Sequence, residues 1–184
     1  EKAWQNACEQ DTPEAYQTCL DGNTLKEYAD EAIKRLQTLQ QQRYTDNGDG
    51  TVTDKKTGLI WLKKANAFGS QDWKTAMQCA ANLAHGQCGL SDGSKAGDWR
   101  LPTKDEWEAM MDERYNKPAL SNAAGTEPWK EGDVFLGVQS SWYWSSTSYK
   151  DNTSLAWTMY IDNGRMYSYG KTFTYYVWTV RGGH

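Results

Sequence analysis

Aromatic residues dominate this sequence, and their abundance excludes a disordered chain. The 184 residues include 10 tryptophans and 11 tyrosines, whereas disordered segments are poor in aromatic residues. A chain of this length buries roughly 70% of its unfolded surface, so a substantial core is available to these rings. Half of the aromatic residues lie between Trp142 and Trp178, which predicts a C-terminal region built around them.

Net charge and hydropathy argue against nucleic-acid binding and against a membrane-spanning helix. The net charge is -4 and no basic stripe is present, so we do not expect the protein to bind nucleic acid. The longest apolar run extends only from Gly58 to Leu62, far short of the roughly 20 residues that a transmembrane helix needs. We therefore expect no membrane span.

The four cysteines form two local couples, Cys8 with Cys19 and Cys79 with Cys88. Neither couple has the CxxC spacing of a zinc site or a thioredoxin-like motif. An even number in close couples favours two short-range disulfides, each worth about 2–3 kcal/mol, over four buried thiols in a cytosolic protein. Disulfides predict a secreted, periplasmic or cell-surface protein. The first residue is Glu1 and not Met, which fits a signal peptide that has been removed or a chain that has been trimmed.

A change of hydrophobic period divides the chain at Arg43. Residues 1–42 predict a helical N-terminal segment, a helical hairpin in which Thr12-Pro13-Glu14 starts one helix. Apolar residues then recur at 3.6-residue spacing from Leu25 to Leu39. Residues 43–184 are expected to form a second domain.

The second domain mixes strands and helices, which predicts an α+β fold. Residues 43–54 indicate a hairpin with a glycine-rich turn, and Asp162-Asn163-Gly164 is typical of a type I′ hairpin. Thr103 and Glu106 have the spacing of a capping box that opens a helix. From Ser140 onward the chain is strand-like, with its last strand predicted over Tyr175 to Arg181.

Alternation along the predicted strands separates core aromatic residues from exposed ones. In residues 155–161, Leu155, Trp157 and Met159 share one face, which we predict to be buried. The expected core tryptophans are Trp61, Trp99, Trp107, Trp144 and Trp157. Tyrosine offers a large contact area at low entropic cost. The predicted ligand-binding residues are the tyrosines expected to be exposed, Tyr143, Tyr160, Tyr167, Tyr169, Tyr175 and Tyr176.

Five ordered segments of the second domain resemble the Lcl C-terminal domain family. They are RYTDNGDGTVTDKKTGLIW from Arg43, CGLSDGS from Cys88, DWRLPT from Asp98, YWSSTSY from Tyr143 and VRGG from Val180. The family occurs in exported bacterial proteins, including collagen-like adhesins. The resemblance implies a C-type lectin-like fold with antiparallel strands and two main helices, related to the sulfatase-modifying (formylglycine-generating) enzymes. The calcium and sugar tripeptides of true C-type lectins are absent, so calcium-dependent sugar binding is not implied.

The sequence favours a binding module over an enzyme. The enzyme relatives use cysteines in the C-terminal part of the fold, and this chain has none after Cys88. The two histidines, His85 and His184, cannot supply a histidine cluster for a catalytic metal. We therefore expect no catalytic residue, metal or cofactor. The prediction is an exported bacterial, non-catalytic, adhesin-like module that recognises a carbohydrate or protein surface through its aromatic C-terminal face.

Two alternatives remain open. The chain could be a structural subunit of a surface assembly or filament, in which the aromatic face packs against other copies as a homo-oligomer. It could also be a variable binding protein diversified by a retroelement, since such proteins use this fold and often end close to Gly-Gly. A single sequence cannot reveal whether the C-terminal region varies, so both alternatives remain beside the binding-module prediction.

Overall fold

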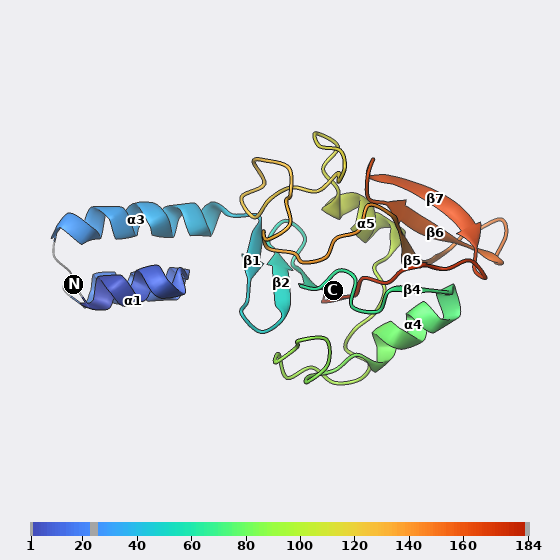
Figure 1. Ribbon diagram of the computed structural model, residues 1–184, viewed down its shortest axis with the longest axis horizontal. Coiled ribbons are helices and arrows are strands. Elements are labelled where there is room, and N and C mark those ends of the chain that lie inside the picture. The colour runs from blue at the N-terminus through green and yellow to red at the C-terminus, as the bar shows by residue number, and fades with distance from the viewer. Residues whose placement is uncertain (1, 23–25, 183–184) are drawn as a thin grey trace. The chain divides into compact units, whose positions relative to one another are not determined.

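Two units make up the chain in the computed structural model, which describes residues 2–22 and 26–182 (Figure 1). The first unit is Glu1–Gln42 and the second is Arg43–His184. Leu25, Gly183 and His184, which the sequence patterns above include, lie outside the described residues. None of the helices in those two described ranges has the length and apolar character needed to cross a membrane.

Three helices form the first unit: α1 (Lys2–Gln10), α2 (Pro13–Asp21) and α3 (Lys26–Gln41). The α2 helix begins as its sequence predicts, with Pro13 in the first turn and the Thr12 hydroxyl accepting a hydrogen bond from the Ala15 amide. The indole of Trp4 packs on Tyr16 and Tyr28, at centroid distances of 5.8 and 5.6 Å. A small aromatic and apolar core therefore holds the three helices together.

The structure contains neither of the predicted disulfides: no cysteine of the described residues is bonded to another. In the first unit the two thiols lie in different environments: Cys8 is exposed on α1, whereas Cys19 is buried in the helical core. In the second unit Cys79 and Cys88 pack against two different apolar clusters.

The second unit consists of two sheets and two helices in its described part. The first sheet has the order β1-β2-β3-β9, with bounds Tyr44–Asp46, Thr51–Asp54, Leu59–Leu62 and Val180–Arg181. The second has the order β4-β8-β5-β6-β7, with bounds Ser70–Gln71, Tyr175–Tyr176, Trp142–Ser148, Leu155–Tyr160 and Arg165–Gly170. The helices are α4 (Trp73–Asn82) and α5 (Lys104–Met110). The predicted α+β class is confirmed, and the C-type lectin-like topology stays a prediction.

The C-terminal segment connects the two sheets. Sequence alternation predicts one strand from Tyr175 to Arg181, but the structure divides it: β8 pairs with β4 and β5, and β9 pairs with β3. Trp178 lies between these strands, fully buried, and its indole donates a hydrogen bond of 2.7 Å to the Leu62 carbonyl. The segment therefore changes sheets at Trp178.

Tryptophan rings fill the core of the second unit. The Trp178 ring lies 5.5 Å from Trp61 and 5.8 Å from Trp107, measured between centroids. Four of the five tryptophans predicted to be core residues are buried, namely Trp61, Trp99, Trp107 and Trp144. The fifth, Trp157, is only half-buried.

The predicted capping box starts α5. The Thr103 hydroxyl accepts from the Glu106 amide, and the Glu106 carboxylate accepts from the Thr103 amide. This cap places Trp107 in the core, where its indole donates to the Trp144 carbonyl. The helix packs against β5, β6 and β7, while α4 contacts β5 (Figure 1).

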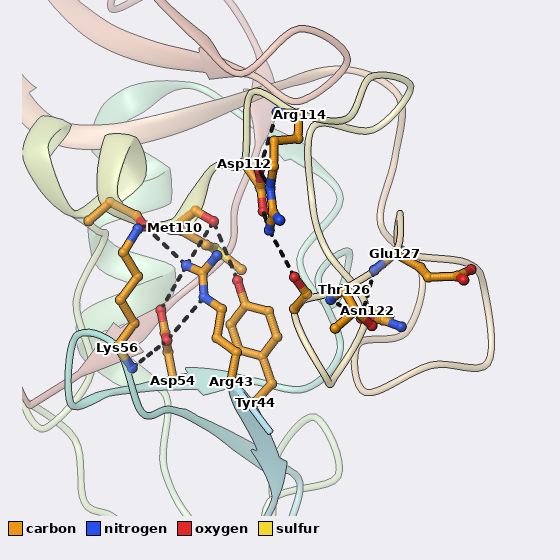
Figure 2. A network of polar contacts seen from close by, with 12 residues as sticks. Arg43, Tyr44, Asp54, Lys56, Met110, Asp112, Arg114, Asn122, Thr126 and Glu127 are labelled. Atoms are coloured by element: carbon orange, nitrogen blue, oxygen red, sulfur yellow. Dashed lines mark hydrogen bonds and ion pairs between the residues drawn. The ribbon is translucent and has the colours of Figure 1, made fainter. Parts of the chain in front are cut away.

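A buried ion pair ties the first residue of the second unit to the end of α5. The Arg43 guanidinium lies 3.1 Å from the carboxylate of Asp54, whose side chain is fully buried. The same guanidinium donates to the carbonyls of Ala109 and Met110, as Figure 2 shows for the surrounding network. These carbonyls end a helix and lack intrahelical partners, so Arg43 acts as a C-terminal cap.

Candidate functional site

Strand register on the second sheet gathers aromatic side chains on one face. Trp142 of β5 pairs with Tyr160 of β6, and on β7 Tyr167 and Tyr169 pair with Thr158 and Ala156 of β6. Paired residues project from the same face of a sheet. The four rings therefore belong to one face, although they come from three strands.

The rings meet around Trp142. Its indole stacks on Tyr160 with centroids 4.4 Å apart and lies edge-on to Tyr167 at 4.9 Å and to Tyr169 at 5.0 Å. Tyr175 of β8 lies 5.3 Å from Tyr169, and Phe173, between β7 and β8, lies 6.4 Å from Tyr175. We call this group the Trp142 cluster; its members are Trp142, Tyr160, Tyr167, Tyr169, Phe173 and Tyr175.

Small side chains beneath the cluster explain its arrangement. Ala156 and Thr158 of β6 lie opposite Tyr169 and Tyr167 and are fully buried. The Thr158 hydroxyl donates to the Tyr167 carbonyl, so its polar group is satisfied. These two residues lie on the face opposite Met159, and they are buried because the rings of neighbouring strands cover them.

The outer edge of the cluster is exposed to solvent. Phe173 has 58% of its surface exposed and Tyr167 has 36%, while the other four members are half-buried. The large apolar side chains that are exposed in the described part of the chain are Ile33, Leu136, Tyr167 and Phe173. The cluster therefore contains two of these four residues: Tyr167 packs on Trp142, and Phe173 packs on Tyr169 and Tyr175.

Polar groups border the cluster at the β6–β7 turn. The Tyr160 hydroxyl donates to the Asp162 carboxylate at 3.1 Å, and the Ser140 hydroxyl donates to the same carboxylate. The hydrogen bond to Asp162 raises the pKa of Tyr160. Asn163 donates through its amide nitrogen to the Tyr167 hydroxyl at 3.2 Å. These contacts fix two hydroxyl groups at the edge of the aromatic face, where a polar ligand can bond to them.

The turn itself differs from the predicted type I′ hairpin. Tyr160 pairs with Arg165, so four residues connect the strands, and within the turn Gly164 has a positive φ of 68° while Asn163 does not. A type I′ turn needs positive φ at both central residues. The longer turn places Asp162 beside Tyr160.

Four of the six predicted ligand-binding tyrosines meet in the cluster, and two do not. Tyr143 is fully buried, so its predicted exposure is wrong: it projects from the opposite face of β5 and packs 5.8 Å from Trp107. Tyr176 lies 5.4 Å from Tyr143 and packs on the same core. Both faces of β5 are covered: Tyr143 packs into the main core on one face, and Trp144 packs with residues of α4 on the other.

Sequence reasoning missed Trp142 and Phe173. Trp142 begins the same aromatic run as Tyr143, and its role depends on a register partner that only strand pairing reveals. Phe173 lies outside any strand. Its position in the sequence, between Tyr169 and Tyr175, was a usable signal of exposure, because connecting segments run over the protein surface.

The opposite face of the β6–β7 hairpin carries a groove of about 490 Å³. The half-buried Trp157 lines it, and the Lys104 ammonium lies 5.3 Å from the centre of its ring. Lys104 also pairs with Glu108. Trp157 was predicted to be core and is instead a half-buried groove residue beside Lys104.

Potential metal ligands are dispersed among the described residues. Among them no group of three or more His, Cys, Asp or Glu side chains is placed to hold a metal ion. The ring nitrogen Nδ1 of His85 accepts a hydrogen bond from the Gly93 amide, which fixes a loop. The Trp142 cluster offers flat apolar rings bordered by hydroxyl, amide and carboxylate groups.

Comparison with known proteins gives a family match. The Lcl C-terminal domain family matches the chain over residues 50–181. The match begins at the β1–β2 turn and ends in β9, so it includes strands β2 to β9 and the whole Trp142 cluster. Among curated proteins, none matches the chain.

Proposed function

This chain belongs to the Lcl C-terminal domain family, and we propose that its second unit is an exported, non-catalytic module that binds a carbohydrate or protein surface. The binding surface is the Trp142 cluster. Family membership supports an extracellular role for the domain. It leaves the ligand open, because function depends on the site and not on the fold.

One observation carries the proposal: six aromatic side chains from four strands and one connection meet on a single face and leave Phe173 and Tyr167 exposed. An exposed aromatic group costs free energy in water unless a ligand covers it. Sugars stack their apolar faces on such rings, and proteins use the same side chains as interface hot spots. The packed neighbours pre-organise the rings, so little side-chain entropy is lost on binding.

The border of the cluster suits a neutral polar ligand. Asp162, with its hydrogen bonds from Tyr160 and Ser140, adds a negative charge beside the rings. A carboxylate opposes sulfated or otherwise anionic ligands. Hydroxyl-bearing sugars and neutral or basic protein surfaces are therefore favoured.

A glycan array and a pull-down from surface extracts, both with the full chain, test the proposal. The informative variant replaces Tyr167 and Phe173 by Ala, because both side chains are exposed and their loss should change stability little. A matched control replaces Tyr115, which lies outside the cluster, by Ala.

Capture by the wild type and the Tyr115→Ala variant, with loss in the double variant, supports the proposal. Capture that survives in the double variant contradicts the position of the binding surface. If neither assay yields a ligand and light scattering shows self-association that the double variant abolishes, the chain is a structural subunit instead.

A further inference from the structure

We propose that a second site, independent of the Trp142 cluster, binds a small molecule that carries a carboxylate on an apolar body. The site is a pocket of about 510 Å³ beside the β1–β2 turn. Small-molecule sites typically enclose roughly 300–1,000 Å³. The pocket is lined by Gly48, Gly50, Lys63, Lys64, Cys88, Gly89 and Leu136.

The walls of the pocket are fixed by backbone contacts. Gly50 has a positive φ of 87°, and a Cβ at this position would lie 2.4 Å from the Gly89 carbonyl oxygen. Glycine is therefore required for the turn to approach the loop that follows α4. The Ser91 amide donates to the Asp49 carbonyl at 2.8 Å, and the Lys63 amide donates to the Gly50 carbonyl at 2.9 Å. The pocket is thus formed before any ligand arrives.

One wall is apolar. Leu136 has 39% of its surface exposed. Its backbone is fixed, because its amide donates to the Lys63 carbonyl and its carbonyl accepts from the Ala65 amide. Cys88 lies beside it, half-buried against the core. Burial raises the pKa of the Cys88 thiol and outweighs the opposing charge of Lys64, so the thiol is neutral at neutral pH. Leu136 and Cys88 therefore offer an uncharged surface for an apolar ligand body.

The rim of the pocket carries one available positive charge. The Lys63 ammonium is 2.5 Å from the Asp46 carboxylate and is neutralised by it. Lys64 is exposed and makes no ion pair with any residue that the structure describes. A charge-assisted hydrogen bond from Lys64 would hold one anionic oxygen group at the rim.

The apolar wall and the single free ammonium together select the ligand class. An uncharged apolar molecule would leave Lys64 unused. A dianionic phosphate would have one unpaired cation at the rim, Lys64, to balance its two charges, and the nearby Asp46 carboxylate would repel it. A monoanionic carboxylate on an apolar chain matches both features.

Decanoate is the probe, titrated into the full chain and followed by calorimetry, with 1-decanol as its neutral analogue. Replacing Lys64 by Gln should weaken decanoate binding by about five- to tenfold, the scale of one charge-assisted hydrogen bond, and leave 1-decanol binding unchanged. Leu136→Ser should weaken both probes. The matched control Lys150→Gln, an exposed lysine in the β5–β6 connection, should match the wild type, and thermal melts confirm that each variant is folded.

Cys88 provides a second readout within the same molecule. Decanoate should slow alkylation of Cys88 by iodoacetamide, while the exposed Cys8 reacts at an unchanged rate. Absence of saturable decanoate binding, equal affinity in Lys64→Gln and wild type, or equal protection of Cys8 would each overturn the site. Binding to phosphatidylglycerol vesicles without binding to monomeric decanoate would also overturn it, since the ligand would then be a membrane surface.

Discussion

The indole of Trp142 stacks on the phenol of Tyr160, with ring centroids 4.4 Å apart and planes inclined by 23°. The two residues are 18 positions apart in the sequence and are brought together by the pairing of β5 with β6. Tyr160 in turn donates to Asp162, so this pair joins the aromatic rings to the polar border. Stacked rings of this kind contribute about 0.5–1.5 kcal/mol beyond the area that they bury.

Trp178 should be the most sensitive core residue, because it lies where the C-terminal segment changes sheets. Replacing Trp178 by Ala should lower the free energy of unfolding by about 3–5 kcal/mol through the cavity it leaves. Trp178→Phe should cost about 1–3 kcal/mol, because it keeps much of the packing but leaves the buried Leu62 carbonyl without its donor. Urea unfolding measures both values. A loss below 1 kcal/mol for the alanine variant would contradict the position assigned to Trp178.

The ion pair of Arg43 with Asp54 should matter far more than a similar pair at the surface. Asp54→Asn leaves Arg43 without its buried counter-charge and should destabilise the protein by about 3–5 kcal/mol. The matched control is Asp46→Asn, which breaks a partly exposed pair with Lys63 and should cost no more than about 1 kcal/mol. Chemical denaturation of both variants compares the two pairs directly, and equal losses would contradict the account.

Glu106 should make stability depend on pH. Burial alone would raise the pKa of its carboxyl, but the hydrogen bonds from Arg100 and Thr103 prevail, and the pKa is lowered from its ordinary value of 4.5. A carboxyl whose pKa is lowered by folding stabilises the protein above the unfolded pKa, and that contribution is lost as the pH falls through the folded value. The gap in unfolding free energy between wild type and Glu106→Gln should therefore be wide at pH 7 and narrow at about pH 3. A gap that does not change with pH would contradict this role.

Cys8 and Cys19 should differ in reactivity. Brief treatment of the native protein with iodoacetamide should alkylate the exposed Cys8 and leave Cys19, which is 1% exposed, unmodified until the protein is unfolded. Mass spectrometry of the digested protein identifies each modified site. Equal rates at the two positions, or an intact disulfide between them, would show that the first unit differs from the structure described here.

Local patterns in the sequence predicted much of the fold. The capping box of Thr103 with Glu106 and the hairpin of residues 43–54 depend on neighbouring residues, so sequence reasoning identified them correctly. Tyr143 and Trp157 depend on which element covers each face of a sheet, and strand alternation carries no information about that. The same limit explains why Trp142 was missed although Tyr160, its partner, was selected.

The affinity of a triple variant for the ligand that the array or pull-down identifies tests the central claim most directly. Tyr160, Tyr167 and Tyr169 are replaced together by Ala, and the dissociation constant is measured beside the thermal transition. We predict a loss of affinity of at least about tenfold, as expected when hot-spot rings are removed, with a thermal transition that remains cooperative but falls, because Tyr160 and Tyr169 also pack on Trp142. Unchanged affinity in a folded triple variant would contradict the assignment of the Trp142 cluster as the binding surface.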